Sequence, residues 1–167
     1  MLYIYKIINK QKIYIMKHFK SVVYEQTLKY NALPFPNVQI KSSEHAYQYA
    51  LDILKHEVLE CKEYFYAIYL NRANNTVSFA KISEGGISGT VVDVRLIMKH
   101  AIDSLASGII LVHNHPSCNV MPSAADNHVT NNIKQAAKLF DINVLDHIII
   151  GNRNGDYFSY ADEGKLN

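Results

Sequence analysis

The stretch from Ile109 to Asp126, IILVHNHPSCNVMPSAAD, decides how this chain folds around its chemistry. Its first four residues are apolar and predict a short buried strand. Side chains alternate along a strand, so His113 and His115 should point to one face and Asn114 to the other. Pro116 cannot donate a ladder hydrogen bond, so the strand should end before it.

A helix should begin a few residues later, because Ser123 is a favourable N-cap residue and Asp126 follows it in the first turn. The strand end and the helix start would then face each other across a short loop. His113, His115 and Asp126 would meet there. Two neutral imidazoles and one carboxylate, with a fourth position left for water, form the ligand set of a catalytic zinc site.

Each part of this stretch also has a simpler interpretation. Ser123 and Asp126 fit a capping box, which needs no metal, and histidines at alternate strand positions often form only a polar face. Their coincidence after a buried strand favours the metal site. The run His113-Asn114-His115 is not the HNH nuclease signature, whose residues lie far apart in sequence. The H-x-E and P-C-x-x-C elements of zinc deaminases are absent from the sequence.

The segment from His113 to Asp126 resembles the JAMM (JAB1, MPN+) metalloprotease motif, H-x-H-P followed by a spacer and S-x-x-D. Its form, HNHPS and then PS-x-x-D, is similar to the bacterial RadC-like branch of that family. The resemblance runs from about Ser42 to the C-terminus. Further matching pieces are Ser83-Glu84-Gly85 with Gly89-Thr90, the run from Leu145 to Gly151, and Tyr157-Phe158-Ser159.

The chain departs from the RadC-like pattern in three places. Cys118 stands where the family usually has Gly, and Val94 replaces a usual Pro before Arg95. The N-terminal helix-hairpin-helix segment of longer members, the part most suggestive of DNA binding, is missing from the sequence given. Cys118 is interpreted as a small loop residue rather than a further metal ligand.

The resemblance implies hydrolysis of a peptide or isopeptide bond with Zn²⁺ held by His113, His115 and Asp126. Such a reaction needs a carboxylate beside the metal to move the proton of the attacking water. We predict Glu84 for this role, because the family's glutamate precedes a glycine at this place in the order of elements. From residue type alone, Glu84 would be a solvated side chain at a strand end.

Ser123 is predicted to help hold the oxyanion, which is the role of the S-x-x-D serine in JAMM enzymes. The alternative is that it only caps the helix. Asp146 and His147 would either orient a metal ligand or be satisfied core residues, and we favour the core. Four glutamates on or after the first predicted helix are interpreted as its solvated face: Glu44, Glu57, Glu60 and Glu63.

Composition places the chain among ordinary globular proteins. It has 167 residues, of which 49% are hydrophobic, and this is enough for one buried core. A net charge of +2 neither demands nor excludes nucleic acid. The two cysteines form no disulfide framework, so a reducing cytoplasm is expected. No signal peptide or membrane span is predicted, and Met16 is an alternative start.

We expect residues 1–36 to form an N-terminal arm or strand and a linker ending in NALPFP, and residues 37–167 to form a JAB/MPN (RadC-like) domain. The pattern predicts an α/β fold, a central mixed sheet flanked by helices, which is the JAB1/MPN-like, cytidine-deaminase-like architecture. The expected strands are Tyr64–Leu70, Thr76–Ile82, Ile109–His113, Asn143–Ile150 and Tyr157–Tyr160. The expected helices are one from Ser42 or Ser43 to about Val58, one capped by Asp93 with a buried stripe of Leu96, Ile97, Ala101, Ile102 and Leu105, and one over Ser123–Phe140 with Val129, Ile133, Ala136, Ala137 and Phe140 inward.

Three functions remain open from the sequence. The first is a zinc-dependent metallopeptidase or isopeptidase acting on a peptide, a protein or a small amide. The second is a non-catalytic RadC-like module that binds a protein or DNA partner, the DNA version resting only on the family's association with repair. The third, a serine hydrolase using Ser117 or Ser123, lacks a G-x-S-x-G elbow. The sequence does not specify an oligomeric state.

Overall fold

The computed structural model describes residues 6–8, 11–13, 35–86, 91–151 and 153–166. The chain divides into two units, Met1–Pro34 and Phe35–Asn167. In the first unit, strands β1 (Lys6–Ile8) and β2 (Gln11–Ile13) pair antiparallel. Met16, residues 31–34 of the expected linker, and the Gly89-Thr90 part of the family resemblance lie outside the described residues.

The second unit is built on a mixed sheet with strand order β4-β3-β5-β6-β7. β5 and β6 are parallel and joined through a helix, and the other neighbours are antiparallel. The strands are β3 (Tyr64–Leu70), β4 (Thr76–Glu84), β5 (Gly108–Asn114), β6 (Asn143–Ile150) and β7 (Tyr157–Ser159). The helices are α1 (Ser43–Ile53), α2 (Val94–Asp103) and α3 (Ala124–Lys138). The predicted mixed sheet flanked by helices is confirmed.

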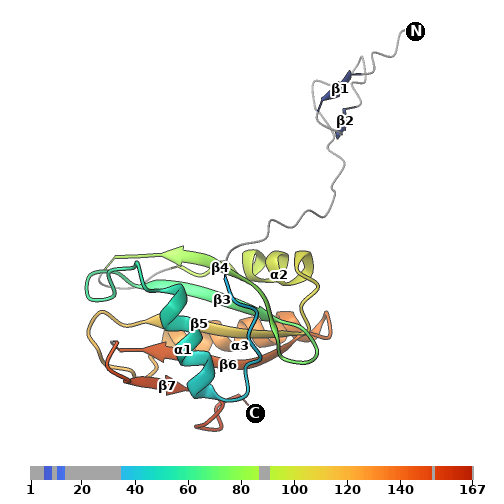
Figure 1. Cartoon of the computed structure of the whole chain (residues 1–167). Helices are drawn as coiled ribbons and strands as arrows, with labels where there is room; N and C mark the ends of the chain where they lie inside the picture. Colours follow the sequence, from blue (N-terminus) through green and yellow to red (C-terminus); the bar gives the residue numbers. More distant parts are fainter. Residues whose placement is uncertain (1–5, 9–10, 14–34, 87–90, 152, 167) are drawn as a thin grey trace. The chain divides into compact units, whose positions relative to one another are not determined.

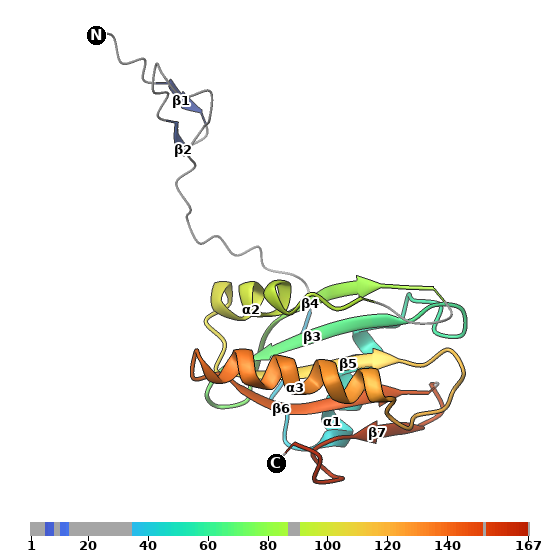
Figure 2. The same cartoon turned by 180° about the vertical axis from the view of Figure 1, so that it is seen from behind.

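Helix α1 covers one face of this sheet (Figure 1), and α3 with α2 covers the other (Figure 2). Strand β5 is buried along its whole length, as its apolar run predicts. Ile110 and Val112 pack in the core under α1, while Ile109 and Leu111 pack in the core under α2 and α3. By the same alternation, His113 points to the α2 and α3 face.

The strand predictions hold to within a few residues, but several apolar residues assigned to the helices are exposed. α2 buries only Ile97, Met98 and Ala101, a narrower stripe than the periodicity suggested. α1 ends at Ile53, so the residues after it are not on a helical face. The exposed residues are Val58, Leu96, Ile102, Leu105 and Phe140. Leu96 and Ile102 are exposed because α2 contacts the sheet along one side only, and the other three residues lie beyond the ends of their helices.

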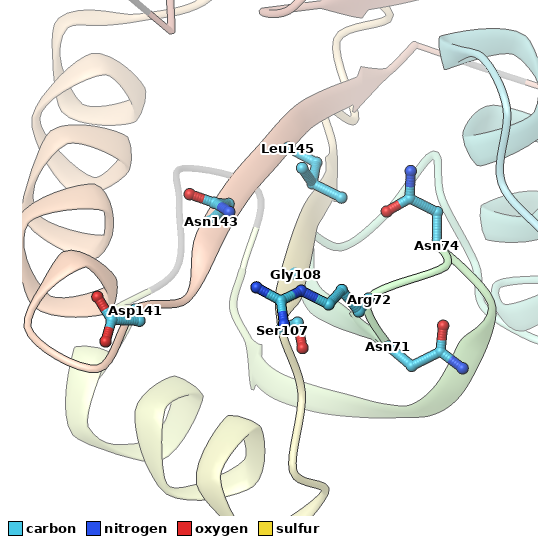
Figure 3. Close-up of a pocket in the computed structure, with 8 residues that line it drawn as sticks. All are labelled: Asn71, Arg72, Asn74, Ser107, Gly108, Asp141, Asn143 and Leu145. Carbon is cyan, nitrogen blue, oxygen red and sulfur yellow. The ribbon is translucent and has the colours of Figure 1, made fainter.

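A polar cavity of about 320 Å³ lies where β5 begins (Figure 3). Gly108 at the start of β5, Asn143 at the start of β6 and Arg72 in the β3–β4 turn contribute to its lining. His113 lies near the other end of β5, so the cavity is separate from the predicted metal site. Within the described ranges, no helix has the length and apolar character needed to cross a membrane.

Candidate metal centre

The three predicted ligands come together where β5 ends and α3 begins. Their ligand atoms lie within 4.8 Å of one another. The Nε2 atoms of His113 and His115 are 2.9 Å apart, and Asp126 Oδ1 lies 3.2 Å from His113 Nε2. Asp126 Oδ2 lies 3.5 Å from His115 Nε2. Ligands bonded to a tetrahedral zinc at roughly 2.0–2.1 Å would be about 3.3 Å apart, so the spacing and donor types suit that ion.

The cluster is buried on one side and accessible on the other. The side chain of His113 is 0% exposed, whereas that of His115 is 16% exposed. Pro116 follows His115 and the chain turns away from the sheet, so His115 lies beyond the last residue of β5. An ion bound here would therefore have a rigid, buried ligand behind it and an approach from the side of His115.

Asp126 belongs to the capping box of α3 and also faces the imidazoles, so capping does not prevent it from acting as a metal ligand. Its Oδ2 accepts hydrogen bonds from the Ser123 backbone N–H at 2.7 Å and from Ser123 Oγ at 2.6 Å. The Asp126 backbone N–H donates back to Ser123 Oγ, which completes a capping box. Oδ1 remains directed at His113. A ligand carboxylate fixed by the first turn of its own helix needs little reorientation to bind a metal.

The electrostatics of the cluster favour a charged carboxylate. Burial opposes ionisation of Asp126, but its interactions with the imidazoles of His113 and His115 and the hydrogen bond from Ser123 outweigh it and hold its pKa well below the usual range. The pKa of His115 is raised, mainly by its hydrogen bond to Asp126. His115 therefore keeps its proton to a higher pH than an isolated imidazole would.

A buried chain of hydrogen bonds supports His113 from behind. His113 Nδ1 lies 2.8 Å from His147 Nε2, and His147 Nδ1 lies 2.6 Å from Thr130 Oγ1. The Thr130 hydroxyl donates to the backbone carbonyl of Asp126 at 2.6 Å. Because Thr130 uses its proton there, His147 Nδ1 is the donor to Thr130 and His147 Nε2 accepts from His113. His113 Nε2 is then left unprotonated for a metal.

His147 is therefore both a satisfied core residue and the partner of a predicted ligand. It is 0% exposed, and burial lowers its pKa well below the ordinary value, which keeps the imidazole neutral. The neighbouring Asp146 has a separate task, since its carboxylate accepts hydrogen bonds from Ser159 Oγ and the Ala161 backbone N–H and so holds the C-terminal segment. The sequence preference for a purely structural His147 missed this contact.

The loop after His115 has a backbone conformation that explains the family's preference for glycine. Cys118 adopts a φ of 61°, in the left-handed region where side chains other than glycine are strained. Its backbone N–H donates to the His115 carbonyl at 2.9 Å, and His115 Nδ1 donates to the carbonyl of Asn119. Cys118 is exposed and is not a member of the ligand cluster.

The structure does not bring Glu84 to this cluster. Glu84 pairs with Tyr64 across β3 and β4, and Tyr64 belongs to the core under α1. Its carboxylate forms ion pairs with Lys62 at 2.6 Å and with Lys81 at 3.1 Å. Hydrogen bonds from both lysines lower its pKa. Glu84 is thus on the opposite face of the sheet from His113 and engaged by two cations.

Glu63 lies on the side of the sheet that the metal ligands use. It immediately precedes β3, and two residues later the Phe65 ring stacks on the His113 ring with centroids 5.7 Å apart. Strand alternation puts Glu63 on the same face as Phe65. The charge of Glu63 also contributes to the raised pKa of His115, after the larger effect of Asp126.

The interpretation of Glu63 as part of the solvated helix face was therefore wrong, because α1 ends at Ile53 and Glu63 belongs to the entry of β3. Its even spacing from Phe65 was the available signal in the sequence. That signal meant nothing until the pairing of Phe65 with His113 was known.

Comparison with known families decides the relationship. A family model described as the RadC-like JAB domain matches residues 40–165. The chain belongs to this family. Relatives of the RadC-like JAB domain include a UPF0758 protein of Flavobacterium johnsoniae, 46% identical over 102 residues, which are 61% of this chain and 44% of that protein.

Two further UPF0758 proteins give the same picture. That of Porphyromonas gingivalis is 47% identical over 105 residues, covering 63% of this chain and 46% of the relative. That of Chlorobaculum tepidum is 36% identical over 130 residues, covering 78% of this chain and 56% of the relative. The chain spans about half the length of the curated relatives it matches.

Proposed function

We propose that this RadC-like JAB domain is a zinc-dependent hydrolase of an amide bond in a peptide, a protein or a small amide. The observation that carries the proposal is the convergence of His113, His115 and Asp126 in one cluster that is accessible on the side of His115. Zn²⁺ held by these three residues would polarise the scissile carbonyl and acidify the attacking water. The remaining chemistry falls to side chains around the cluster.

Glu63 is the proton carrier in this proposal, in place of Glu84. Its carboxylate would accept the proton of the attacking water and deliver it to the departing nitrogen. Strand alternation from Phe65 puts Glu63 on the face of His113, whereas Glu84 lies on the other face and is paired with Lys62 and Lys81. A base held by two lysines on the wrong side of the sheet would have to break both pairs before it could act.

Ser123 has a defined place and a second proposed task. Its hydroxyl donates to Asp126 Oδ2 and accepts from the Asp126 backbone N–H, so its one proton is already used. To stabilise an oxyanion, Ser123 would turn this proton from Asp126 toward the substrate. The cap would keep the Ser123 backbone N–H on Asp126 while the hydroxyl moved.

The test combines metal analysis with cleavage of defined amide probes. The wild-type chain, Glu63→Gln, Glu84→Gln and His113→Ala would be loaded with zinc and incubated with a mixed set of short peptides and lysine isopeptides, with products read by mass spectrometry. Glu84→Gln is the matched control, because it makes the same chemical change on the opposite face.

We expect zinc in the wild type and in both glutamate variants, and none in His113→Ala. Cleavage should fall by about 10²–10⁴-fold in Glu63→Gln, the usual contribution of a general base, and stay near the wild-type rate in Glu84→Gln. The reverse result would restore Glu84 as the base. A zinc-loaded wild type that cleaves none of the probes would contradict the hydrolase and favour a binding module.

A further inference from the structure

The residue between the two histidines is held as firmly as they are. Asn114 is 0% exposed, and its side chain points away from the metal face toward the core under α1. Its Oδ1 accepts a hydrogen bond from the backbone N–H of Tyr64 at 2.9 Å. Its Nδ2 donates to the carbonyls of Leu59 at 2.9 Å and Lys62 at 2.8 Å. Both amide protons and one acceptor are thus used by a single stretch of backbone.

Two of those partners belong to the peptide groups on either side of Glu63. The Lys62 carbonyl is part of the peptide that enters Glu63, and the Tyr64 N–H is part of the peptide that leaves it. Asn114 therefore fixes both peptide planes attached to the Glu63 Cα. The chain between α1 and β3 has no regular helix or strand at this point, so its own secondary structure does not supply this constraint.

The backbone N–H and carbonyl of Glu63 itself are also hydrogen-bonded. The Gly85 N–H donates to the Glu63 carbonyl at 2.8 Å, and the Glu63 N–H donates to the Gly86 carbonyl at 3.4 Å. With Asn114 on one side and the glycines on the other, the backbone of Glu63 is fixed across the sheet. Strand alternation then directs its side chain to the face on which Phe65 and His113 stack.

We infer that Asn114 is the positioning residue that sets Glu63 against the metal ligands on either side of Asn114. The inference rests on the proposed function, because it gives Glu63 the proton transfer. Asn114 touches neither metal nor substrate. Because Asn114 belongs to the same strand as His113, its hydrogen bonds fix the distance between Glu63 and the metal ligands.

A variant that removes the hydrogen bonds of Asn114 should affect proton transfer by Glu63 and leave the three predicted metal ligands in place. Asn114→Ser shortens the side chain beyond reach of Leu59, Lys62 and Tyr64 and leaves room for water. Asn114→Asp, which keeps the acceptor for Tyr64 and loses both donors, serves if the serine variant does not fold. Thr76→Val is the matched control, because it removes a buried acceptor of the Val38 N–H at the far end of β4.

Two probes read the effect, Zn²⁺ affinity by chelator competition and the pH dependence of the visible absorption of the Co²⁺-loaded protein. Asn114→Ser should bind Zn²⁺ within about threefold of wild type, since water replaces a residue that is not a ligand. Its Co²⁺ absorption midpoint should shift in the direction seen for Glu63→Gln. In the Glu63→Gln background, Asn114→Ser should shift the Co²⁺ absorption midpoint no further. Thr76→Val should lower thermal stability and leave that midpoint unchanged.

The amide probes give a parallel reading. Asn114→Ser should lower kcat at least tenfold in the wild-type background and less than twofold in the Glu63→Gln background, because its effect passes through Glu63. An equal loss in both backgrounds, or a Co²⁺ midpoint unchanged from wild type, would overturn the inference and leave Asn114 as a structural residue. A wild-type chain that binds neither metal would instead refute the proposed function.

Discussion

The two carboxylate oxygens of Asp126 have different partners, Ser123 for Oδ2 and His113 for Oδ1, and this leads to a quantitative prediction for Ser123→Ala. The substitution removes the hydroxyl that bonds both Asp126 Oδ2 and the Asp126 backbone N–H. It leaves the Ser123 backbone N–H on Oδ2 and the approach of Oδ1 to His113. The helix start should therefore weaken while the metal site persists.

Loss of a serine N-cap costs about 1 kcal/mol. With an unfolding entropy of roughly 2.1 cal/mol/K per residue, the metal-free domain from Phe35 to Asn167 should lose about 3–4 °C in Tm. Saturating zinc at about a hundred times its Kd should add about 2.7 kcal/mol, or close to 10 °C. Ser123→Ala should keep most of that increment, whereas Asp126→Ala should lose it together with the cap.

The assay is thermal unfolding of each variant in chelator and again in excess zinc. Ser42→Ala is the matched control, because Ser42 caps α1 by accepting from the His45 N–H and lies outside the metal cluster. It should lower the baseline and keep the full zinc increment. The reasoning would be refuted if Ser123→Ala lost the increment as completely as Asp126→Ala, or if Asp126→Ala retained it.

Three further outcomes follow from contacts around the cluster. Thr130→Val removes the acceptor of the buried His147 Nδ1–H. The free energy of unfolding, measured by denaturation, should fall by about 1–3 kcal/mol, and zinc affinity, measured by chelator competition, should fall by about 10–100-fold. An unchanged affinity would mean that another contact sets the tautomer of His113. The raised folded pKa of His115 means that its contact with Asp126 stabilises the metal-free chain fully below about pH 6.5 and less as pH rises through the raised value. The metal-free Tm should fall across that window, and zinc should bind more weakly below it because the proton must leave; a Tm flat with pH would contradict this. Cys118→Gly removes the backbone strain of a side chain at a left-handed φ. After the entropy cost of glycine, the free energy of unfolding in urea should rise by up to about 1 kcal/mol. A destabilised variant would show that Cys118 is not strained.

The sequence predicted the ligand cluster because all of its determinants are local. The apolar run before His113, the proline after His115 and the cap at Ser123 are each readable within a few residues. Strand alternation and the first helical turn then determine the directions of the three side chains. The same locality explains why the strands of the sheet were placed within a few residues.

The sheet faces of Glu84 and Glu63 could not be predicted, because they depend on pairing between distant strands. Glu84 ends β4 just before Gly85, and Glu63 immediately precedes β3. The sequence does not indicate which face of the sheet each side chain occupies. The register that pairs Phe65 with His113 and Tyr64 with Glu84 decides it. The exposed apolar residues of α2 were missed for a related reason, since the width of a buried stripe depends on how a helix lies against its sheet.

Strand β5, which carries His113, is bonded on both edges to β3 and β6 and buried on both faces. Its amide protons should therefore exchange with solvent only when the whole domain opens. Small zinc domains collapse when stripped of their ion, whereas this strand packs into a hydrophobic core on each of its faces. A preparation that lacks a metal at this cluster should therefore still show the secondary structure of the folded domain, and metal analysis or a lower Tm would be needed to reveal the loss.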